Sequence, residues 1–340
     1  MEKAGALMTS VFSVIPGMEL PVSEVVDTMA KMWESNEPKR GHVAPSEFRA
    51  SQMNLILHLG YGTTDEEAKY LFKTVNRFAH AYPSRIIILC PTPAEDANTL
   101  LTGKLYSECY IGSSRRDMRC CEILTLGYDV NAPKYLENQV SIWLESDLPT
   151  YYWTHRLPPE RINTTYKNFI SFCKQKVYDS SIEGREFRSQ LDEPEAFRNL
   201  SYARLLPIRQ TIGQGLSGFE PALLAENMES ASLTCSEQYY MEGGALSHWI
   251  FNCLRACAKE SEVKLPFSEL KVESSAEEGA SDFDLQFVYT DGKQLRLRAD
   301  ISPGIASMTG NMGRGEFNYS LKAGLLSPEN TLAEAIFFNS

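Results

Sequence analysis

The stretch RASQMNLILHLGYGTTDEEAKYLFKTVNRFAHAYPSRIIILC, residues 49–90, decides the fold class. Its first apolar run, residues 53–59, has few charges and ends at Gly60, which is typical of a strand buried on both faces. A helical pattern follows and ends at Pro83, and a second β-branched run occupies residues 85–90. The stretch therefore predicts a βαβ crossover unit of right-handed connection, and with it an α/β core.

Two sequence signals predict the helix inside this unit, a capping box and a periodic spacing of apolar residues. Thr63 with Glu66, or Thr64 with Glu67, supplies a capping box at its start. Apolar residues then recur at spacings of three and four, which places them on one helix face: Ala68, Leu71, Phe72, Val75, Phe78, Ala79 and Tyr82.

Length, composition and charge restrict the class of protein. The chain has 340 residues, enough for two domains, and its net charge of −11 argues against a general binder of nucleic acid or anionic membrane. The N-terminus lacks a clear cleavage site, and no run approaches the ~20 apolar residues of a membrane span. The eight cysteines show no C-x-x-C spacing, so we expect a reduced, cytoplasmic protein.

We place a first, α/β domain at residues 1–190, with a mixed or parallel sheet around the βαβ unit. Apolar periodicity predicts its further elements. They are helices at 21–35 and 133–145, a helix around 169–173, and strands at 104–111, 120–128, 148–154 and 176–181. The charged stretch 181–199 is expected to bridge the two halves.

The second domain, residues 191–340, is predicted to be α+β with an antiparallel sheet. Pro207 must kink or restart a helix over 200–212. The other expected elements are a buried helix at 243–259, strands at 227–240, 283–289, 295–299 and 316–321, a loop at 304–315 and a final helix at 328–338.

Two of these strands form a predicted hairpin across Asp291-Gly292. A three-residue loop, Thr290 to Gly292, places Gly292 in the left-handed position. We expect this loop to pair Phe287 with Leu297 and Leu285 with Ala299, and to set Asp284 across from Arg298.

Gly213-Gln-Gly215-Leu-Ser-Gly218 matches the dinucleotide fingerprint, with Glu237 about 20 residues further on. Its context fails, because a fingerprint follows a hydrophobic strand and opens a long helix. We therefore expect a loop that happens to contain glycines. An α/β enzyme or nucleotide-binding sensor remains the alternative function.

The βαβ unit gives independent evidence on whether the chain has a nucleotide site. Ligands of parallel sheets lie at the carboxyl ends of the strands, where this chain continues into GYGTTDEE and PTPAEDAN, whose acidic residues repel phosphate. Arg49 and Arg85 lie near the amino ends instead. We expect a structural or interface role for this pair rather than catalysis.

Catalytic and metal signatures are missing from the sequence. The five histidines lack H-x-x-x-H spacing, and no G-x-S-x-G, H-E-x-x-H or Walker sequence occurs. Tyr151, Tyr152 and Trp153 end a strand, so at least one of them fills the core and another is a candidate for docking. We predict no catalytic residue, metal or cofactor.

The chain contains the blocks RASQMNLILHL, HAYPSRIIILCPTP, DLPTYYWTHRLP with a following VYDSS, and LSYARLLPIRQ. These blocks resemble the OpcA family, the glucose-6-phosphate dehydrogenase assembly proteins. The resemblance covers most of the chain, and it implies a non-enzymatic accessory protein that binds glucose-6-phosphate dehydrogenase and favours its active oligomer. Such a partner acts by differential affinity and needs no chemistry of its own.

The family's motif positions carry over residue by residue. Asn54, Pro83 and Ser84 are among these positions, and structural roles are expected for Asn54 and Pro83. The possible partner contacts or motif residues that the resemblance implies are Arg49, Arg85, Trp153, Asp179, Arg204 and Arg209.

Overall fold

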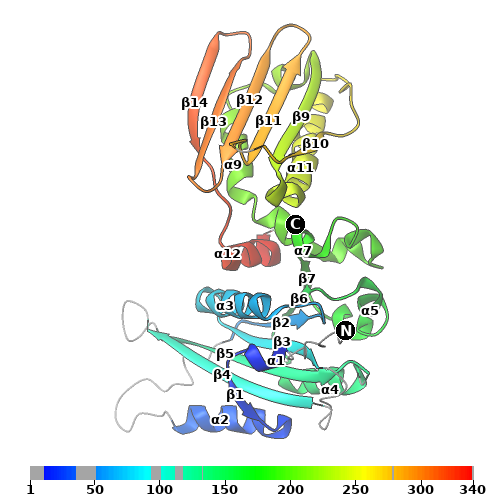
Figure 1. Cartoon of the computed structure of the whole chain (residues 1–340), viewed down its shortest axis with the longest axis vertical. Coiled ribbons are helices and arrows are strands. Elements are labelled where there is room, and N and C mark those ends of the chain that lie inside the picture. Colours follow the sequence, from blue (N-terminus) through cyan, green and yellow to red (C-terminus); the bar gives the residue numbers. More distant parts are fainter. Residues whose placement is uncertain are drawn as a thin grey trace, which may run out of the picture. The chain divides into compact units, whose positions relative to one another are not determined.

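The structure is a computed structural model that describes residues 11–35, 51–92, 101–111, 118–131, 133–277 and 279–338. The chain forms two compact units, Met1–Arg198 with Ala335–Ser340, and Asn199–Glu334. Each contains one sheet and its own hydrophobic core (Figure 1). The predicted fold class, an α/β domain followed by an α+β domain, is confirmed.

Unit 1 is built around an eight-stranded sheet of order β1-β4-β5-β3-β2-β6-β7-β8. Its strands are β1 (Met18–Leu20), β2 (Met53–Leu59), β3 (Ser84–Thr92), β4 (Leu101–Ile111), β5 (Met118–Asp129), β6 (Thr150–His155), β7 (Gln175–Tyr178) and β8 (Phe197–Asn199). Its helices are α1 (Val11–Val14), α2 (Val25–Ser35), α3 (Asp65–Ala81), α4 (Pro133–Trp143), α5 (Pro159–Asn163), α6 (Lys167–Ser171) and α7 (Ser180–Glu183). Short 3₁₀ turns are η1 (Val22–Glu24), η5 (Arg188–Gln190) and η6 (Pro194–Ala196).

The predicted βαβ unit is present as β2, α3 and β3. Strands β2 and β3 pair in parallel, and both are buried along almost their whole length. Of the two possible capping boxes the chain uses Thr64 with Glu67, because the Thr64 hydroxyl accepts from the Glu67 N–H and the Glu67 carboxylate accepts from the Thr64 N–H. The apolar face of α3 is buried as its spacing predicts.

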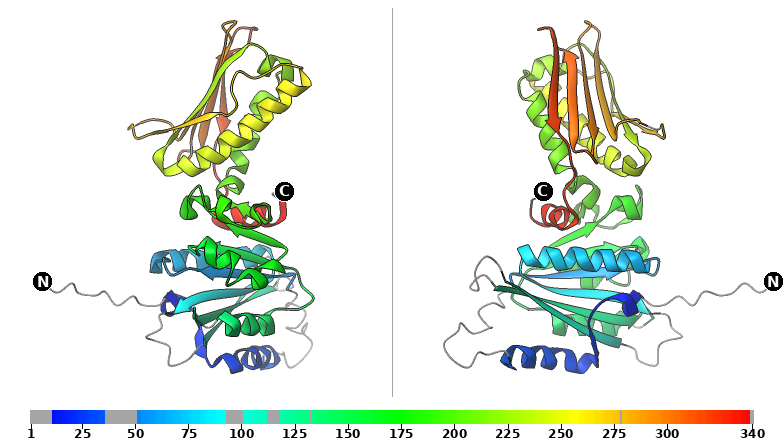
Figure 2. Two further views of the ribbon diagram at one scale, coloured as in Figure 1. Left: turned by 90° about the vertical axis from the view of Figure 1, so that its right-hand side faces the viewer. Right: turned by 60° about the vertical axis from the view of Figure 1, so that its left-hand side comes forward.

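Helices cover both faces of this sheet. α3 lies against one face and α4 against the other (Figure 2). Residues on alternate positions of a strand divide between these layers, so Ile56 joins the cluster that holds Trp143 of α4. The end of the chain also joins unit 1, since the Phe337 ring lies 5.0 Å from Tyr82 and 5.8 Å from Tyr151, centroid to centroid.

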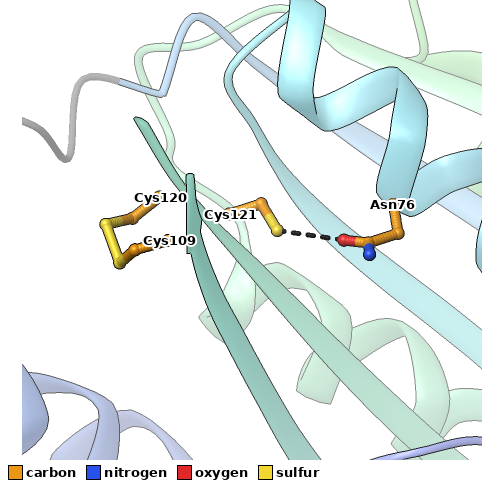
Figure 3. Close-up of a disulfide and its surroundings, with 4 residues drawn as sticks. All are labelled: Asn76, Cys109, Cys120 and Cys121. Atoms are coloured by element: carbon orange, nitrogen blue, oxygen red, sulfur yellow. Dashed lines mark hydrogen bonds between the residues drawn. A yellow bond between two sulfur atoms is a disulfide. The ribbon is translucent and has the colours of Figure 1, made fainter. Parts of the chain in front are cut away.

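Cys109 and Cys120 form a disulfide, so the expectation of reduced cysteines is wrong for this pair (Figure 3). The register of β4 and β5 sets the two residues directly opposite, with Cα atoms 4.0 Å apart. Sequence spacing gave no sign of it, because only the hairpin register brings residues 11 positions apart together. Cys121 points to the opposite face, where its thiol donates to Asn76 Oδ1 at 3.2 Å.

Unit 2 contains a six-stranded sheet of order β10-β9-β11-β12-β13-β14. Its strands are β9 (Met228–Ser236), β10 (Lys271–Ser275), β11 (Phe283–Tyr289), β12 (Gln294–Asp300), β13 (Ile305–Asn311) and β14 (Glu316–Lys322). Its helices are α8 (Leu200–Ala203), α9 (Leu206–Leu216), α10 (Pro221–Ala225), α11 (Tyr240–Glu260) and α12 (Pro328–Ala333), with the 3₁₀ turn η7 (Glu237–Tyr239). The π-helical turn η8 (Glu334–Phe338) continues α12.

All pairs in this sheet are antiparallel except β9 with β10. Helices α9 and α11 cover one face (Figure 2). The restart predicted at Pro207 occurs, since α8 ends before it and α9 begins with it in the first turn.

The β11–β12 hairpin confirms the three-residue loop but corrects its pairing. Gly292 has φ +86°, and Asp284 stands opposite Arg298 as predicted. Phe287 pairs with Leu295, however, and Leu285 with Leu297, two positions from the predicted partners. The predicted pairs are inconsistent with the Asp284 register, and the structure keeps the register that the loop length dictates.

Three local predictions in unit 2 are wrong. The expected loop 304–315 contains β13, and β10 had no predicted counterpart. Gly213 and Gly215 lie within α9 rather than in a loop. A Cβ on Gly215 would lie 2.3 Å from Met308 Cε, so this glycine permits close packing of the helix on the sheet.

Candidate functional site

The carboxyl ends of β2 and β6 form the natural ligand position of the unit 1 sheet. These strands are parallel neighbours. From β2 the chain continues through α3 to β3 on one side, and from β6 it continues to β7 on the other. Parallel sheets bind ligands at such a point, where the connections depart in opposite directions.

The backbone itself closes this point. The Gly60 N–H donates to His155 O at 2.7 Å, and a Cβ on Gly60 would lie 1.8 Å from Arg156 O. Arg156 has φ 56°, a left-handed conformation that a side chain rarely adopts. Glycine at position 60 is therefore required by the close approach of the two strand ends.

The Arg156 side chain forms an ion pair beside these two strand ends. Its guanidinium makes a bidentate contact with the Glu67 carboxylate, with Nη2 at 2.6 Å from Oε1 and Nε at 2.9 Å from Oε2. This hydrogen bonding lowers the pKa of Glu67 to about 2. His155 Nε2 lies 3.7 Å from the same carboxylate, and burial lowers the pKa of that histidine, which keeps it neutral.

These contacts disfavour a phosphate at this position. The first turn of α3 carries Asp65, Glu66 and Glu67, whose charges oppose an anion at the helix N-terminus. The guanidinium of Arg156, which could attract a phosphate, is held by Glu67. The inferred acidic carboxyl edge therefore agrees with the geometry at Asp65, Glu66 and Glu67, although the inference missed Arg156. Residues 93–98 of the second acidic loop, PTPAEDAN, lie outside the described residues.

A cavity of about 540 Å³ adjoins the ion pair. Glu183 lies at its wall and accepts a hydrogen bond from the Arg156 N–H at 2.5 Å, while burial raises the pKa of this carboxyl to about 7. The volume suits a small molecule. The lining consists of two arginines, two prolines, glycines and a few larger residues: Gly62, Arg156, Leu157, Pro158, Pro159, Ile182, Glu183, Gly184, Arg185, Glu186, Phe187 and Gln190.

Sequence reasoning missed Glu183, because it assigned residues 181–199 to a charged bridge. The signal available in the sequence was Gly184, which is flanked by the charged residues Glu183 and Arg185 and ends the short helix α7.

A buried polar network lies in the interior of the same sheet. His58 contacts the Tyr152 hydroxyl through Nδ1 at 2.8 Å and the Tyr128 hydroxyl through Nε2 at 2.7 Å, and Tyr128 reaches the Tyr166 hydroxyl at 3.1 Å. Burial lowers the pKa of His58 to about 3. His58 is thus a neutral, satisfied core residue, as predicted for the histidines. Across the described part of the chain, no three His, Cys, Asp or Glu side chains gather as a metal site requires.

Arg85 lies at the amino end of β3, as predicted, and is 6% exposed. Its guanidinium contacts Glu122 Oε2 at 3.1 Å and Glu145 Oε1 at 2.6 Å, and donates to Trp143 O at 3.1 Å. It therefore ties the end of α4 to the sheet, and a partner contact by Arg85 stays a prediction. Arg49 lies outside the described residues.

Asn54 supports the same helix end as Arg85. Its side-chain amide donates to Glu145 O at 2.9 Å, and its Oδ1 accepts from the Glu145 N–H at 3.1 Å. The structural role implied for Asn54 agrees with these contacts.

Trp153 lies in β6, and Asp179 follows β7. Tyr151, Tyr152 and Trp153 are all buried, because β6 is a central strand between β2 and β7. Asp179 is half-buried and caps α7 by accepting from the Ser181 N–H. A partner contact by either Trp153 or Asp179 stays a prediction.

Arg204 and Arg209 both lie in the helical layer of unit 2. Arg204 Nη1 contacts the buried Glu242 at 2.7 Å. Arg209 Nη1 donates to the Tyr202 hydroxyl at 2.7 Å, and its guanidinium lies 4.0 Å from the centre of that ring. Both arginines are half-buried, and contact with a partner stays a prediction for them as well.

The other face of the unit 2 sheet carries mainly polar side chains. Ser232, Gln286, Arg296, Thr309 and Asn318 stand at matching register positions across five strands, opposite the apolar side chains that meet the helices. A hollow of about 410 Å³ lies on this face over β11 to β14. We call this surface the polar sheet face.

Comparison with known proteins identifies part of the chain. Residues 75–196 match the model of a family described as the glucose-6-phosphate dehydrogenase subunit N-terminal domain. The resemblance to the OpcA family is confirmed over this segment. No curated protein matches the chain. The described residues include no helix long and apolar enough to cross a membrane.

Solved structures give weak similarity. An aldose-aldose oxidoreductase from Caulobacter crescentus, complexed with glycerol, has 9% identity and a TM-score of 0.36. A 3-ketoreductase from Actinomadura kijaniata, in complex with NADP and TDP-benzene, has 10% identity and a TM-score of 0.39. Each match covers 84% of this chain and 87% of the other. Scores this low carry no inference about function.

Proposed function

We propose that this chain, whose residues 75–196 carry a domain of the glucose-6-phosphate dehydrogenase assembly family, binds that dehydrogenase and promotes its assembly into the active oligomer. The family match is the observation that carries the proposal. The chain acts as an accessory protein without a reaction of its own, and it needs no bound cofactor. A partner that binds the assembled state more tightly than the dissociated state shifts the population by that difference in affinity.

The ion pair at the carboxyl edge supports this function over nucleotide binding. Arg156 and Glu67 satisfy each other where a pyrophosphate would lie. Two of the fingerprint glycines, Gly213 and Gly215, lie inside α9, and Gly215 permits the packing of this helix against Met308. Calorimetric titration with NADP and ATP tests the alternative, and saturable binding of either would support a nucleotide sensor.

We assign the contact with the dehydrogenase to the polar sheet face of unit 2. Interfaces of non-obligate complexes are about as polar as other protein surface, and a broad sheet face with a hollow suits such a contact. The assignment is supported by the exposed amides, hydroxyls and charges that this face presents.

Mixing the purified chain with its cognate dehydrogenase tests the proposal. The two proteins should co-elute from a sizing column, and the activity or oligomeric state of the dehydrogenase should change. Separate elution with unchanged activity at micromolar protein would exclude the function.

A matched pair of variants tests the surface. Thr309→Arg adds a bulky charge to the polar sheet face, and Gln214→Arg adds the same group to the exposed surface of α9. We expect Thr309→Arg to weaken binding by roughly tenfold or more, because it crowds a packed interface, and Gln214→Arg to leave binding unchanged. Equal affinity of both variants would move the contact away from this face.

A further inference from the structure

Strand β14, Glu316–Lys322, ends the unit 2 sheet on one side (Figure 1). Within the described residues it pairs with β13 alone. Its sequence, EFNYSLK, has no proline and carries its one lysine at the end, so it lacks the usual features that keep edge strands from pairing. Tyr319, at its centre, is 50% exposed.

The hydrogen bonds at the end of the β13–β14 ladder show which backbone groups face outward. The Ala323 N–H donates to O of Gly304, the residue directly opposite, at 3.0 Å. Bonded pairs alternate along an antiparallel ladder, so Phe317, Tyr319 and Leu321 bond to β13. The even-numbered residues then direct their N–H and C=O groups to the outer edge.

The hydrogen bond of the Lys322 carbonyl agrees with this assignment of the even-numbered residues to the outer edge. This carbonyl accepts a hydrogen bond of 2.7 Å from the Thr211 hydroxyl, which does not belong to β13. The N–H and C=O groups of Asn318 and Ser320 therefore face outward at the middle of the strand.

The strand is complementary to itself when reversed about Tyr319. In an antiparallel pair of two copies centred there, Glu316 stands opposite Lys322 of the second copy, and Phe317 stands opposite Leu321. Asn318 stands opposite Ser320, so the outward backbone groups of both copies meet as hydrogen-bonded pairs. Charges, apolar side chains and backbone phase agree in this single register.

Neighbouring registers lose part of this agreement. If one strand slides by one residue relative to the other, each residue whose N–H and C=O face outward meets a residue whose groups face β13. The hydrogen bonds between the two copies are then lost. A centre at Asn318 or Ser320 keeps the ladder phase but removes the partner of Glu316, which then faces Ser320 or Gly324. Charge complementarity thus selects the register centred on Tyr319.

We propose that two copies of this chain associate through β14, antiparallel and with a two-fold axis at Tyr319, to join their sheets into one continuous sheet. The second copy is the occupant because the strand complements its own sequence in both charge and hydrogen bonding. The proposal is independent of the proposed function, since sedimentation of the chain alone tests it.

Ser320→Pro tests the backbone pairing. Proline removes the outward N–H of residue 320 and leaves the bonds to β13, which the odd-numbered residues make. Each dimer loses the bond twice, so we expect the dissociation constant measured by analytical ultracentrifugation to rise roughly tenfold to hundredfold. Ser320→Ala keeps the N–H and should remain dimeric. A monomeric wild-type chain, or a Ser320→Pro dimer of unchanged affinity, would overturn the proposal.

Charge reversal tests the register. Glu316→Lys places lysine opposite lysine, and Lys322→Glu places glutamate opposite glutamate, so each single variant should weaken the dimer. The double variant restores opposite charges across the axis and should recover wild-type affinity. A double variant weaker than both single variants would contradict this register.

Cysteine crosslinking gives a second measure that does not depend on affinity. Residues of a non-bonded antiparallel pair have Cα atoms about 4.5 Å apart, within reach of a disulfide. Tyr319→Cys should therefore crosslink two chains under mild oxidation. Asn318→Cys, whose nearest symmetry mate lies further along the strand, should crosslink no more than the wild-type chain. Crosslinking of Asn318→Cys alone would refute the axis at Tyr319.

Discussion

Two sheet edges in this molecule differ in whether their polar groups already have partners within the chain. At the carboxyl edge of unit 1, Arg156 and Glu67 satisfy each other and Gly60 admits the neighbouring backbone. At the outer edge of unit 2, β14 pairs with β13 on one side, and its outward backbone groups pair with no other strand among the described residues. The carboxyl edge of unit 1 is thus occupied by an ion pair of its own side chains. The outer edge of β14 is where we propose that a second copy of the chain binds.

The largest expected effect comes from the buried ion pair of unit 1. Arg85→Met leaves the carboxylate of Glu122, which is 3% exposed, without this cation. We expect a loss of about 3 to 5 kcal/mol in the free energy of unfolding of unit 1, measured by urea denaturation with hydrogen exchange of its amides.

The matched control for Arg85 lies in unit 2. Arg298 contacts Asp284 at 3.3 Å, and its side chain is 49% exposed, so Arg298→Met should change stability by about 0.5 kcal/mol or less. A loss at Arg298 as large as that at Arg85 would show that unit 2 is held by charges as much as unit 1 is.

The disulfide gives the next largest effect. Replacement of Cys109 and Cys120 by serine removes a crosslink across 11 residues, and we expect unit 1 to lose roughly 2 to 3 kcal/mol. Urea denaturation of the wild-type chain with and without a reductant provides the comparison. If reduction leaves the midpoint unchanged, the β4–β5 hairpin needs no crosslink.

The two glycines of α9 separate packing from helix propensity in unit 2. Gly215→Val drives a branched side chain toward Met308 and should cost about 1 to 3 kcal/mol. A Cβ on Gly213 meets open space, and Gly213→Ala should stabilise unit 2 by about 0.5 to 1 kcal/mol. Thermal denaturation of both variants measures the difference, and a neutral Gly215→Val would show that the helix can move away from the sheet.

The smallest effect is a pH dependence at the cavity of unit 1. The pKa of Glu183, about 7 in the folded chain, lies above its unfolded value, so folding binds a proton between these values. Stability should fall as pH rises from about 4.5 to 7. Glu183→Gln removes this loss and should stabilise the chain by on the order of 1 kcal/mol at pH 8, after allowance for solvent screening. Parallel pH profiles that differ by a constant would assign the titration to another group.

Patterns of short range predicted most of this fold. The spacing of α3, its capping box and the apolar runs of β2 and β3 are local properties, and all three appear in the structure. β13 was missed because its composition is that of a loop. Gly310 within it leaves room for Gln294 O, which a Cβ would approach to 2.3 Å, a requirement that is set by the neighbouring strand.

The candidate site was less predictable for the same reason. Arg156 and Glu67 are 89 residues apart, and their contact depends on β6 lying beside β2. The disulfide likewise depends on hairpin register. Pattern recognition found which strands exist, but the order of strands in the sheet decides which side chains meet.

The position of Phe337 has a consequence for synthesis. This ring packs with Phe78, Tyr82 and Tyr151, all of them emerging from the ribosome long before it. Unit 2 lies between these partners in the chain and can be complete while the aromatic cluster of unit 1 still lacks its last member. The unit that is translated first therefore gains one of its packed rings only after unit 2 has been translated, and a chain that lacks Phe337 loses these ring contacts.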